Sequence, residues 1–277
     1  MGTLYVVATP IGNLKDITFR AIEVLKSVNI IACEDTRVTH RLLSYYSITG
    51  KKLISYHEHN EEETAKKLVS LLEKEDIALV SDAGTPCISD PGYRVVKLAW
   101  EKGYQVVPIP GAFAGAVALS ASGLPTDRFL FEGFLPNKKE KKLKRLEELI
   151  NLEITFILYE SPKRVLNTLQ IINELAPASD IVVAKELTKI HEKFFRGKPA
   201  QVIQELSSKE EYLKGEFVII CYPVVEKQIN IKEIEKTIRE LHQQGLKSKE
   251  IAKIISQQCQ ISKNQAYQMV IEYLKNF

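Results

Sequence analysis

Short apolar runs alternate with longer amphipathic stretches through the first 125 residues of this 277-residue chain. The short runs have strand length, and each leads into a stretch with helical periodicity. Because strands connected through helices lie parallel in one sheet, the alternation predicts a mostly parallel sheet with helices on both faces. We expect strands near residues 4–8, 29–33, 52–55, 77–81 and 105–109, and helices near 18–27, 36–46, 61–74, 91–102 and 112–121.

Similar runs resume after Leu135-Pro136-Asn137, and a helical pattern alone fills the last part of the chain. We expect strands near 154–159, 180–185, 192–196 and 216–221, and helices near 139–150, 163–175, 199–206, 231–242, 249–257 and 263–275. The sequence therefore predicts two α/β domains, at residues 1–135 and 136–225. A linker at 223–230 then leads to a helix-turn-helix-like extension at 231–277.

Cysteine and histidine usage indicates neither a disulfide framework nor a metal site. The four cysteines lie far apart without a C-x-x-C pair, and the five histidines show no H-x-x-x-H spacing. No apolar run approaches the roughly 18 residues of a membrane span, and the amino terminus lacks the regions of a signal peptide. We expect a cytoplasmic globular protein with no metal and no membrane contact.

Charge is distributed unevenly. The formal net charge of +3 is too small to indicate nucleic-acid binding by the whole chain. From residue 227 onward, however, nine Lys/Arg face five Asp/Glu. The extension could therefore contact nucleic acid, and a small helical interaction or dimerisation unit is an equal alternative.

The segment LVSDAGTPCISDP, residues 79–91, carries an apolar strand straight into carboxylates, prolines and a glycine. In α/β sheets, ligands bind just beyond the carboxyl ends of the strands, which is where Ser81 and Asp82 stand. Gly84 permits close backbone approach, while the prolines fix the shape of the loop. The alternative is a tight loop in which Asp82 merely caps the helix that starts near Gly92.

Two more loops reach the same sheet edge, TPIGN at residues 9–13 and IPGAFAGA at 109–116. Together the three loops predict a pocket, although the small residues Gly115 and Ala116 could equally reflect close helix packing. None of the loops has the glycine pattern of a dinucleotide-binding or triphosphate-binding motif. The pocket therefore suits a ligand held by backbone groups and one or two carboxylates.

Polar clusters follow three further strands: ACEDTR at 32–37, SYHEHNE at 55–61 and AKELTKIHE at 184–192. Asp35 and Asn60 could simply cap the helices that follow. Capping does not explain Arg37, His57 and Glu58 together, nor the density of charged groups in the last cluster. These clusters are candidates for substrate contact and proton transfer.

In this order and spacing, VATPIGNLKDIT, ACEDTR, SYHEHNE, VSDAGTPCISDPG, PIPGA, YESPKR and KELTKIHE resemble the bacterial 16S ribosomal RNA (cytidine-2'-O)-methyltransferases of the tetrapyrrole methylase superfamily. The resemblance spans roughly residues 3–223 and is weaker beyond residue 230. It implies two α/β domains of tetrapyrrole-methylase type with S-adenosylmethionine in the cleft between them. It also implies 2'-O-methylation of a cytidine in 16S rRNA, an rRNA or small-ribosomal-subunit partner, and a homodimer.

The resemblance also implies a set of cofactor-binding residues. From the first domain these are Thr9, Pro10, Gly12, Asp82, Ala83, Gly84, Pro86, Pro110, Gly111 and Ala112, and from the second Tyr159, Glu160 and Ser161. Phe113 departs from the family pattern, which has a small polar residue there. Either one hydrogen bond to the cofactor is absent, or Phe113 packs on its adenine.

Transfer of a methyl group from a sulfonium removes positive charge from sulfur, so an anion placed against the sulfur would stabilise the ground state more than the transition state. We therefore expect Asp82 to bind elsewhere on the cofactor, and positioning to supply most of the acceleration. The ribose hydroxyl must lose its proton to a base. Candidates are His57, Glu58, Glu186 and Lys185, with the last two preferred.

RNA needs positively charged and polar contacts near the cleft. We expect these from Asp35, Arg37, Asn60, Arg164 and His191, and from the cluster Lys138, Lys139, Lys141 and Lys142. The lysine cluster could also be only a solvated helix face. Two other functions stay open: a corrin or porphyrin methyltransferase of the same superfamily, and a non-enzymatic RNA-binding protein.

Overall fold

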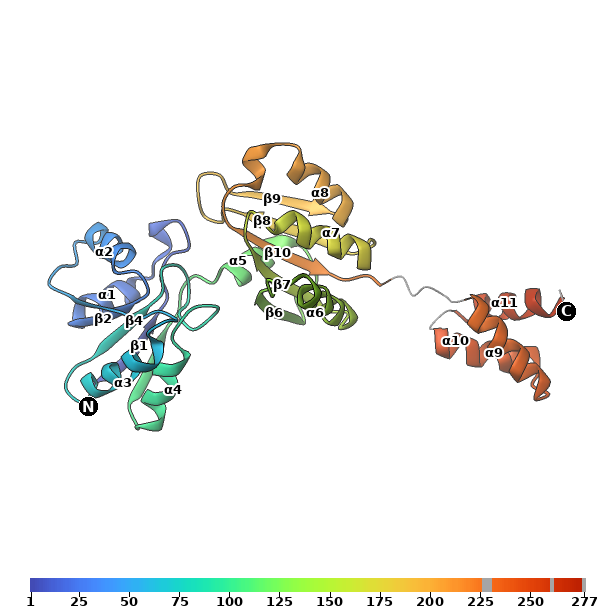
Figure 1. Cartoon of the computed structure of the whole chain (residues 1–277), viewed down its shortest axis with the longest axis horizontal. Helices are drawn as coiled ribbons and strands as arrows, with labels where there is room; N and C mark the ends of the chain where they lie inside the picture. The colour runs from blue at the N-terminus through green and yellow to red at the C-terminus, as the bar shows by residue number, and fades with distance from the viewer. Residues whose placement is uncertain (226–230, 260–261, 276–277) are drawn as a thin grey trace. The chain divides into compact units, whose positions relative to one another are not determined.

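A computed structural model describes residues 1–225, 231–259 and 262–275 of the chain. The chain divides into two compact units, Met1–Val225 and Glu226–Phe277 (Figure 1). Residues 226–230 of the expected linker lie outside the described residues. The expected domain boundaries at 135 and 225 remain predictions.

The first sheet is entirely parallel, with strand order β3-β2-β4-β1-β5. Every residue of β2 and β4 is buried, as expected for central strands covered on both faces. The strands are β1 Thr3–Val7, β2 Ile30–Cys33, β3 Lys52–Ser55, β4 Ile77–Val80 and β5 Gln105–Ile109. The helices are α1 Phe19–Ser27, α2 Thr36–Tyr45, α3 Glu61–Leu71, α4 Tyr93–Glu101 and α5 Ala114–Ser122, with a short 3-10 turn η1 at Leu14–Asp16.

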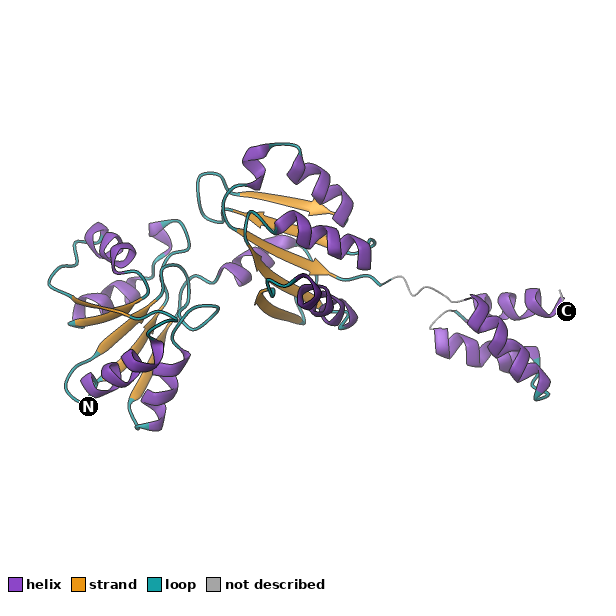
Figure 2. Cartoon of the chain, viewed as in Figure 1, coloured by secondary structure: helices purple, strands orange, loops and turns teal. Residues whose placement is uncertain are grey.

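Successive residues of one strand enter different cores, which accounts for helices on both faces (Figure 2). Leu79 of β4 packs with Leu68 of α3 and Val95 of α4. Its neighbours Ala78 and Val80 pack with Leu25 of α1 and residues of α2 on the other face. The predicted parallel sheet with two helical layers is therefore confirmed.

The second sheet is mixed, in the order β6-β7-β10-β8-β9, and only the β6–β7 pair is parallel. Its strands are β6 Phe129–Phe134, β7 Thr155–Glu160, β8 Asp180–Lys185, β9 Lys193–Gly197 and β10 Phe217–Tyr222. Its helices are α6 Lys139–Asn151, α7 Val165–Leu175 and α8 Pro199–Ser207, with a 3-10 turn η2 at Glu210–Leu213.

The edge strand β6 was not predicted. Most of its residues are exposed or half-buried, and its pairing register shifts between Phe131 and Gly133, so no clean alternation marks it in the sequence. Because β6 belongs to the second sheet, the chain leaves the first sheet before residue 129. This crossing precedes the expected boundary at residue 135.

Contacts between the two sheets bring their loops together. Ala118 and Leu119 of α5 pack against Ile157 of β7 and Ile220 of β10. The backbone amide of Asn13 donates to the Thr188 hydroxyl at 3.0 Å. The loop after β1 therefore touches the loop after β8.

The second unit is a small helical bundle of α9 Ile231–Gln243, α10 Ser248–Cys259 and α11 Lys263–Lys275. Its core is formed by Ile234, Ile238, Ile251, Ala252, Ile255, Ala266 and Val270. The helical extension predicted from periodicity is thus present. Within the part of the chain that the structure describes, no helix has the length and apolar character needed to cross a bilayer.

Candidate functional site

The first cavity of interest, here called the aromatic cavity, has a volume of about 340 Å³ and receives residues from both sheets. The loop after β4 contributes Gly84 and Asp90, the loop after β5 contributes Phe113, and the end of β7 contributes Tyr159. Five of the predicted cofactor residues line it: Ala83, Gly84, Tyr159, Glu160 and Ser161. The predicted convergence of strand-end loops from two sheets therefore produces a real cavity.

Other predicted cofactor residues lie elsewhere. Thr9, Pro10 and Asp82 line a separate cavity of about 270 Å³ beside α2. Gly12, Pro86, Pro110, Gly111 and Ala112 line neither cavity. The predicted cofactor-binding residues thus fall into two groups: those that line the aromatic cavity and those that lie outside its lining.

Several of these outer residues hold the loops in shape. The backbone amides and carbonyls of Thr9 and Gly84 exchange two hydrogen bonds, of 2.8 and 3.0 Å. A Cβ on Gly12 would lie 2.6 Å from Cγ of Lys189, and one on Gly111 would lie 2.7 Å from Cβ of Ala8. Gly12 and Gly111 are therefore required by close packing between loops.

Asp82 does not cap the helix near Gly92. One carboxylate oxygen of Asp82 accepts the backbone amide of Asp35 at 2.9 Å. The amide of Gly92 donates instead to Glu61 at 3.1 Å. Asp82 thus ties the loop after β4 to the loop after β2, and the capping alternative is wrong.

An aromatic wall runs along the cavity. The ring of Phe131 makes edge-on contacts with Phe113 and Tyr159, at centroid distances of 4.9 and 5.1 Å. Phe134 adds an edge-on contact to Tyr159 at 5.6 Å, and the Tyr159 hydroxyl accepts the amide of Gly115 at 3.2 Å. Phe113 is therefore fixed at the cavity wall, where its ring could face a flat heterocycle.

Asp90 lines the same cavity but is not among the predicted site residues, although it lies within the loop segment 79–91. Burial raises the pKa of Asp90 to about 6, and the nearby charges of Glu34 and Asp82 add to the rise. Cys87 and Ser89, in the same loop, have φ values of 71° and 63°, which side-chain-bearing residues rarely adopt. Such backbone strain is often concentrated at binding sites.

A second cavity, here called the polar cavity, has a volume of about 480 Å³. It is lined by the predicted Lys185, Glu186 and His191, and Gly215 lines both this cavity and the aromatic one. Glu186 accepts the Lys189 ammonium at 2.9 Å and the Glu216 amide at 3.0 Å. Burial alone would raise the pKa of Glu186, but these hydrogen bonds outweigh it and hold the pKa below its usual value.

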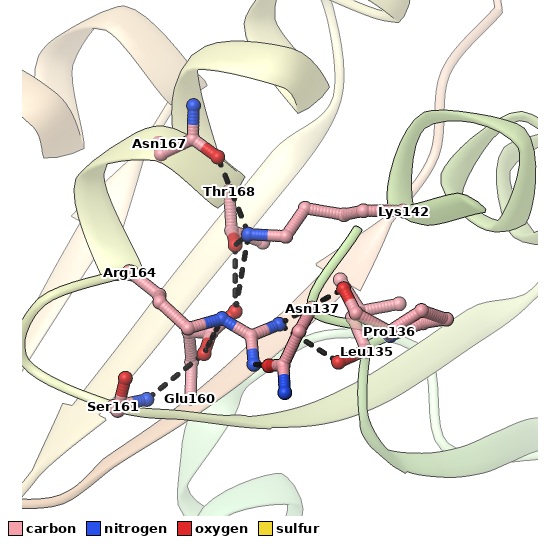
Figure 3. A network of polar contacts seen from close by, with 9 residues as sticks. All are labelled: Leu135, Pro136, Asn137, Lys142, Glu160, Ser161, Arg164, Asn167 and Thr168. Carbon is pink, nitrogen blue, oxygen red and sulfur yellow. Dashed lines mark hydrogen bonds and ion pairs between the residues drawn. The ribbon is translucent and has the colours of Figure 1, made fainter. Parts of the chain in front are cut away.

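Glu160 is the centre of a buried polar network (Figure 3). Its carboxylate accepts the Thr168 hydroxyl at 2.7 Å and the Ser161 amide at 2.9 Å, and it pairs with the Lys142 ammonium at 3.7 Å. The Arg164 guanidinium pairs with Glu160 at 3.1 Å, and it also donates to Leu135 and Asn137. The network fixes the wall segment that follows β7.

This network involves two residues predicted to contact RNA, Lys142 and Arg164. Lys142 is only 3% exposed, because its ammonium points inward to Thr168, Asn167 and Glu160 rather than to solvent. Burial lowers its pKa. The Arg164 guanidinium forms an ion pair with Glu160 and donates hydrogen bonds to Leu135 and Asn137 in the loop before α6. The buried Lys142 ammonium is not available as a surface contact for phosphate, whereas Lys138, Lys139 and Lys141 are exposed. The Arg164 side chain is 25% exposed, so its contact with RNA stays a prediction.

The remaining predicted residues lie at the ends of β2 and β3. Asp35 caps α2 and pairs with Arg37 at 2.6 Å, and the hydrogen bonds from Arg37 lower the pKa of Asp35 to about 2. Asn60 makes no capping bond to α3 but closes its own loop through Ser55 and His57. His57 and Glu58 line none of the three cavities, and Nδ1 of His57 is buried without a hydrogen-bond partner.

Residues 84–85, 88–90, 113, 159–161 and 215–218 thus line a cavity of small-molecule size in a two-sheet α/β protein. Among residues 1–225, 231–259 and 262–275, no cluster of His, Cys, Asp or Glu could hold a metal ion. Residues 3–203 match the family model described as Tetrapyrrole (Corrin/Porphyrin) Methylases, and the chain belongs to this family.

Named relatives agree with this assignment. The chain is 50% identical over 220 residues to Ribosomal RNA small subunit methyltransferase I of Halalkalibacterium halodurans, covering 79% of the chain and 75% of that protein. It is 42% identical over 277 residues to the protein of that name from Synechocystis, covering 98% of each. Two solved structures share the fold. Diphthine synthase has a TM-score of 0.62 at 13% sequence identity, and the match covers 85% of this chain and 94% of that chain. Cobalt precorrin-4 methyltransferase has a TM-score of 0.59 at 18% sequence identity, and the match covers 79% of this chain and 94% of that chain.

S-adenosylmethionine is the cofactor of this family, and the residues of the aromatic cavity fit it. Phe113 and Tyr159 would hold the adenine. Backbone groups of the Gly84 and Ser161 segments, with the Asp90 carboxylate, match the polar groups of the cofactor away from its sulfur. When bound, the cofactor would supply an activated methyl group.

Replacing Lys142 with Met should lower the free energy of unfolding by about 3 kcal/mol, because Glu160 would lose a partner in a buried site. Urea unfolding followed by circular dichroism measures the change. The neighbouring Lys141→Met, at an exposed position, is the matched control and should be nearly neutral. Equal effects of the two substitutions would contradict the buried network.

Replacing Asp90 with Asn should stabilise the protein above pH 6 by about 1–2 kcal/mol, after allowance for solvent screening. The folded state holds the proton up to a pKa of about 6, against the ordinary value of 3.8, so wild-type stability falls as pH rises through this range. At pH 4 the two proteins should differ little. Thermal unfolding from pH 4 to 8 is the measurement, with the exposed Asp127→Asn as control. A gain that does not vary with pH would refute this origin.

Proposed function

We propose that this chain is an S-adenosylmethionine-dependent methyltransferase that modifies the 2'-hydroxyl of a cytidine in 16S ribosomal RNA. The observation that carries the proposal is the match along 98% of the chain to a protein named Ribosomal RNA small subunit methyltransferase I. The two adjoining cavities support it, since one suits the methyl donor and the other suits a polar acceptor. The target nucleotide type and the 2'-oxygen come from the motif resemblance.

We assign the acceptor hydroxyl to the polar cavity next to Glu186. Two hydrogen bonds hold this carboxylate in one orientation, so it can align the hydroxyl and accept its proton as the oxygen becomes nucleophilic. Because its pKa is low, Glu186 stays ionised at neutral pH. Of the other candidates, His57 and Glu58 lie away from both cavities, which makes them weaker candidates.

The proposed partners follow from the substrate. The chain would act on 16S rRNA or the small ribosomal subunit in the cytoplasm, and a homodimer is proposed from the family resemblance. Lys138, Lys139 and Lys141 are exposed and could follow the RNA backbone, as could the basic helical unit.

The decisive assay incubates the purified chain with labelled S-adenosylmethionine and, separately, small ribosomal subunits, naked 16S rRNA or a tetrapyrrole. Label should enter ribosomal RNA and resist alkaline cleavage at the modified nucleotide, because a 2'-O-methyl group removes the attacking hydroxyl. Mass spectrometry then identifies the nucleotide. Labelling of the tetrapyrrole alone would favour the corrin or porphyrin reaction that the family description names. Binding of RNA without any labelling would favour a non-enzymatic role.

Glu186→Gln should lower kcat by about 100-fold or more while leaving cofactor affinity unchanged, since the amide keeps the shape but cannot take a proton. Calorimetry measures cofactor binding and single-turnover labelling measures the rate. Lys97→Met, at an exposed ion pair on α4, serves as the control. Full activity of the Gln variant would exclude Glu186 as the base.

A further inference from the structure

The polar and aromatic cavities meet at Gly215, which lines both. Gly215 has a φ of 98°, and a Cβ there would lie 2.5 Å from Cγ and Cδ of Glu186. No side chain can therefore occupy this position without displacing Glu186. The absence of a side chain at Gly215 keeps the partition between the cavities thin, so a group in one cavity can reach a molecule in the other.

Lys185 differs from the other lysines around the polar cavity in the partners of its ammonium group. The residue is only 6% exposed and lines the cavity, yet within residues 1–225 no carboxylate lies within 4.0 Å of its ammonium and no hydrogen bond is formed by it. Its Nζ atom is not among the fully buried side-chain atoms of the described residues that lack a partner, so the ammonium is open to the cavity. The ammonium is therefore placed to donate to an acceptor that comes from outside the chain.

Nearby lysines differ, because each already has a carboxylate partner. Lys189 pairs with Glu186 and Glu216 at 2.9 Å, Lys193 with Glu205 at 2.9 Å, and Lys214 with Glu210 at 2.8 Å. Glu192 and Glu211 also line the cavity. A phosphate would meet these carboxylates at close range, so the mixed walls favour an uncharged group with both acceptors and donors.

The pyrimidine edge has the matching pattern. Cytosine presents acceptors at O2 and N3 and a donor at its N4 amino group, whereas uracil carries a hydrogen at N3. Lys185 supplies donors only, and the carboxylates of Glu192 and Glu211 supply acceptors. Enzymes that modify a base read the extruded base by its Watson–Crick edge, and the same edge is open to an enzyme that modifies the ribose of an unpaired nucleotide.

We propose that the polar cavity receives the base of the target nucleotide and that Lys185 reads it, by donating to N3 and O2 of cytosine. This inference rests on the proposed RNA methyltransferase function. That function places only the acceptor hydroxyl in the polar cavity, and the inference adds the base of the same nucleotide. It gives Lys185 a role in substrate selection rather than in proton transfer. Volume is sufficient, since about 480 Å³ accommodates a pyrimidine nucleoside.

The test uses full-length chain, labelled S-adenosylmethionine and small ribosomal subunits from cells that lack this protein. After the modified nucleotide is mapped, subunits are also prepared with uridine in its place. Lys185→Met should lower kcat/KM for the cytidine subunits by roughly 10- to 100-fold or more, because the hydrogen bonds from a charged donor to N3 and O2 are lost. The preference for cytidine over uridine should fall toward one. Cofactor affinity by calorimetry should not change.

Lys97→Met, at an exposed ion pair on α4 that lines neither cavity, should keep wild-type rate and preference. Lys185→Gln provides a second variant if the Met variant fails to fold, because an amide can donate to cytosine or accept from uracil and should also weaken the preference. Unchanged activity, or lost activity with an unchanged preference, would overturn the base-reading role. If wild-type protein labels neither acceptor, the proposed function itself fails.

Discussion

The parallel arrangement of the first sheet is the constraint on which the site depends. All five strands end at the same edge, so the loops after β1, β4 and β5 must lie near one another. The paired backbone hydrogen bonds of Thr9 and Gly84 then join two of these loops. Asp82 extends the same connection to the loop after β2 through the Asp35 amide. These hydrogen bonds hold the loops at the sheet edge in fixed positions beside one another.

Two buried lysines show how the surroundings decide the use of a charge. The ammonium of Lys142 finds Thr168, Asn167 and Glu160 and serves the stability of the second sheet. The ammonium of Lys185 finds no such partner within the first unit and faces a cavity. The cost of burying a charge is offset inside the protein for Lys142, whereas the Lys185 ammonium stays open to the cavity and can meet a ligand. Both residues are lysines in charged segments, so composition could not distinguish them.

Much of the fold followed from local pattern. Strands such as Ile77–Val80 and Phe217–Tyr222 are apolar throughout, and helices such as α7 have clear periodicity, so their positions agree closely with expectation. The edge strand β6 could not be predicted from the sequence, because most of its residues are exposed or half-buried and its pairing register is irregular. In the site, Gly84 and Tyr159 were found through their motifs, while Gly215 carried no local signal. Its importance comes from Glu186, which approaches it from a distant strand end.

The sequence by itself determined the order of the strands and helices other than β6, the three loops at one sheet edge and the family motifs, because these depend on residues close together in the chain. Only the tertiary structure decided which charged side chains would be buried, paired or left facing a cavity. That outcome depends on partners such as Glu160 for Lys142, brought together by packing across the second sheet. Distances between remote segments set the electrostatic energy of each group, and no local pattern contains them.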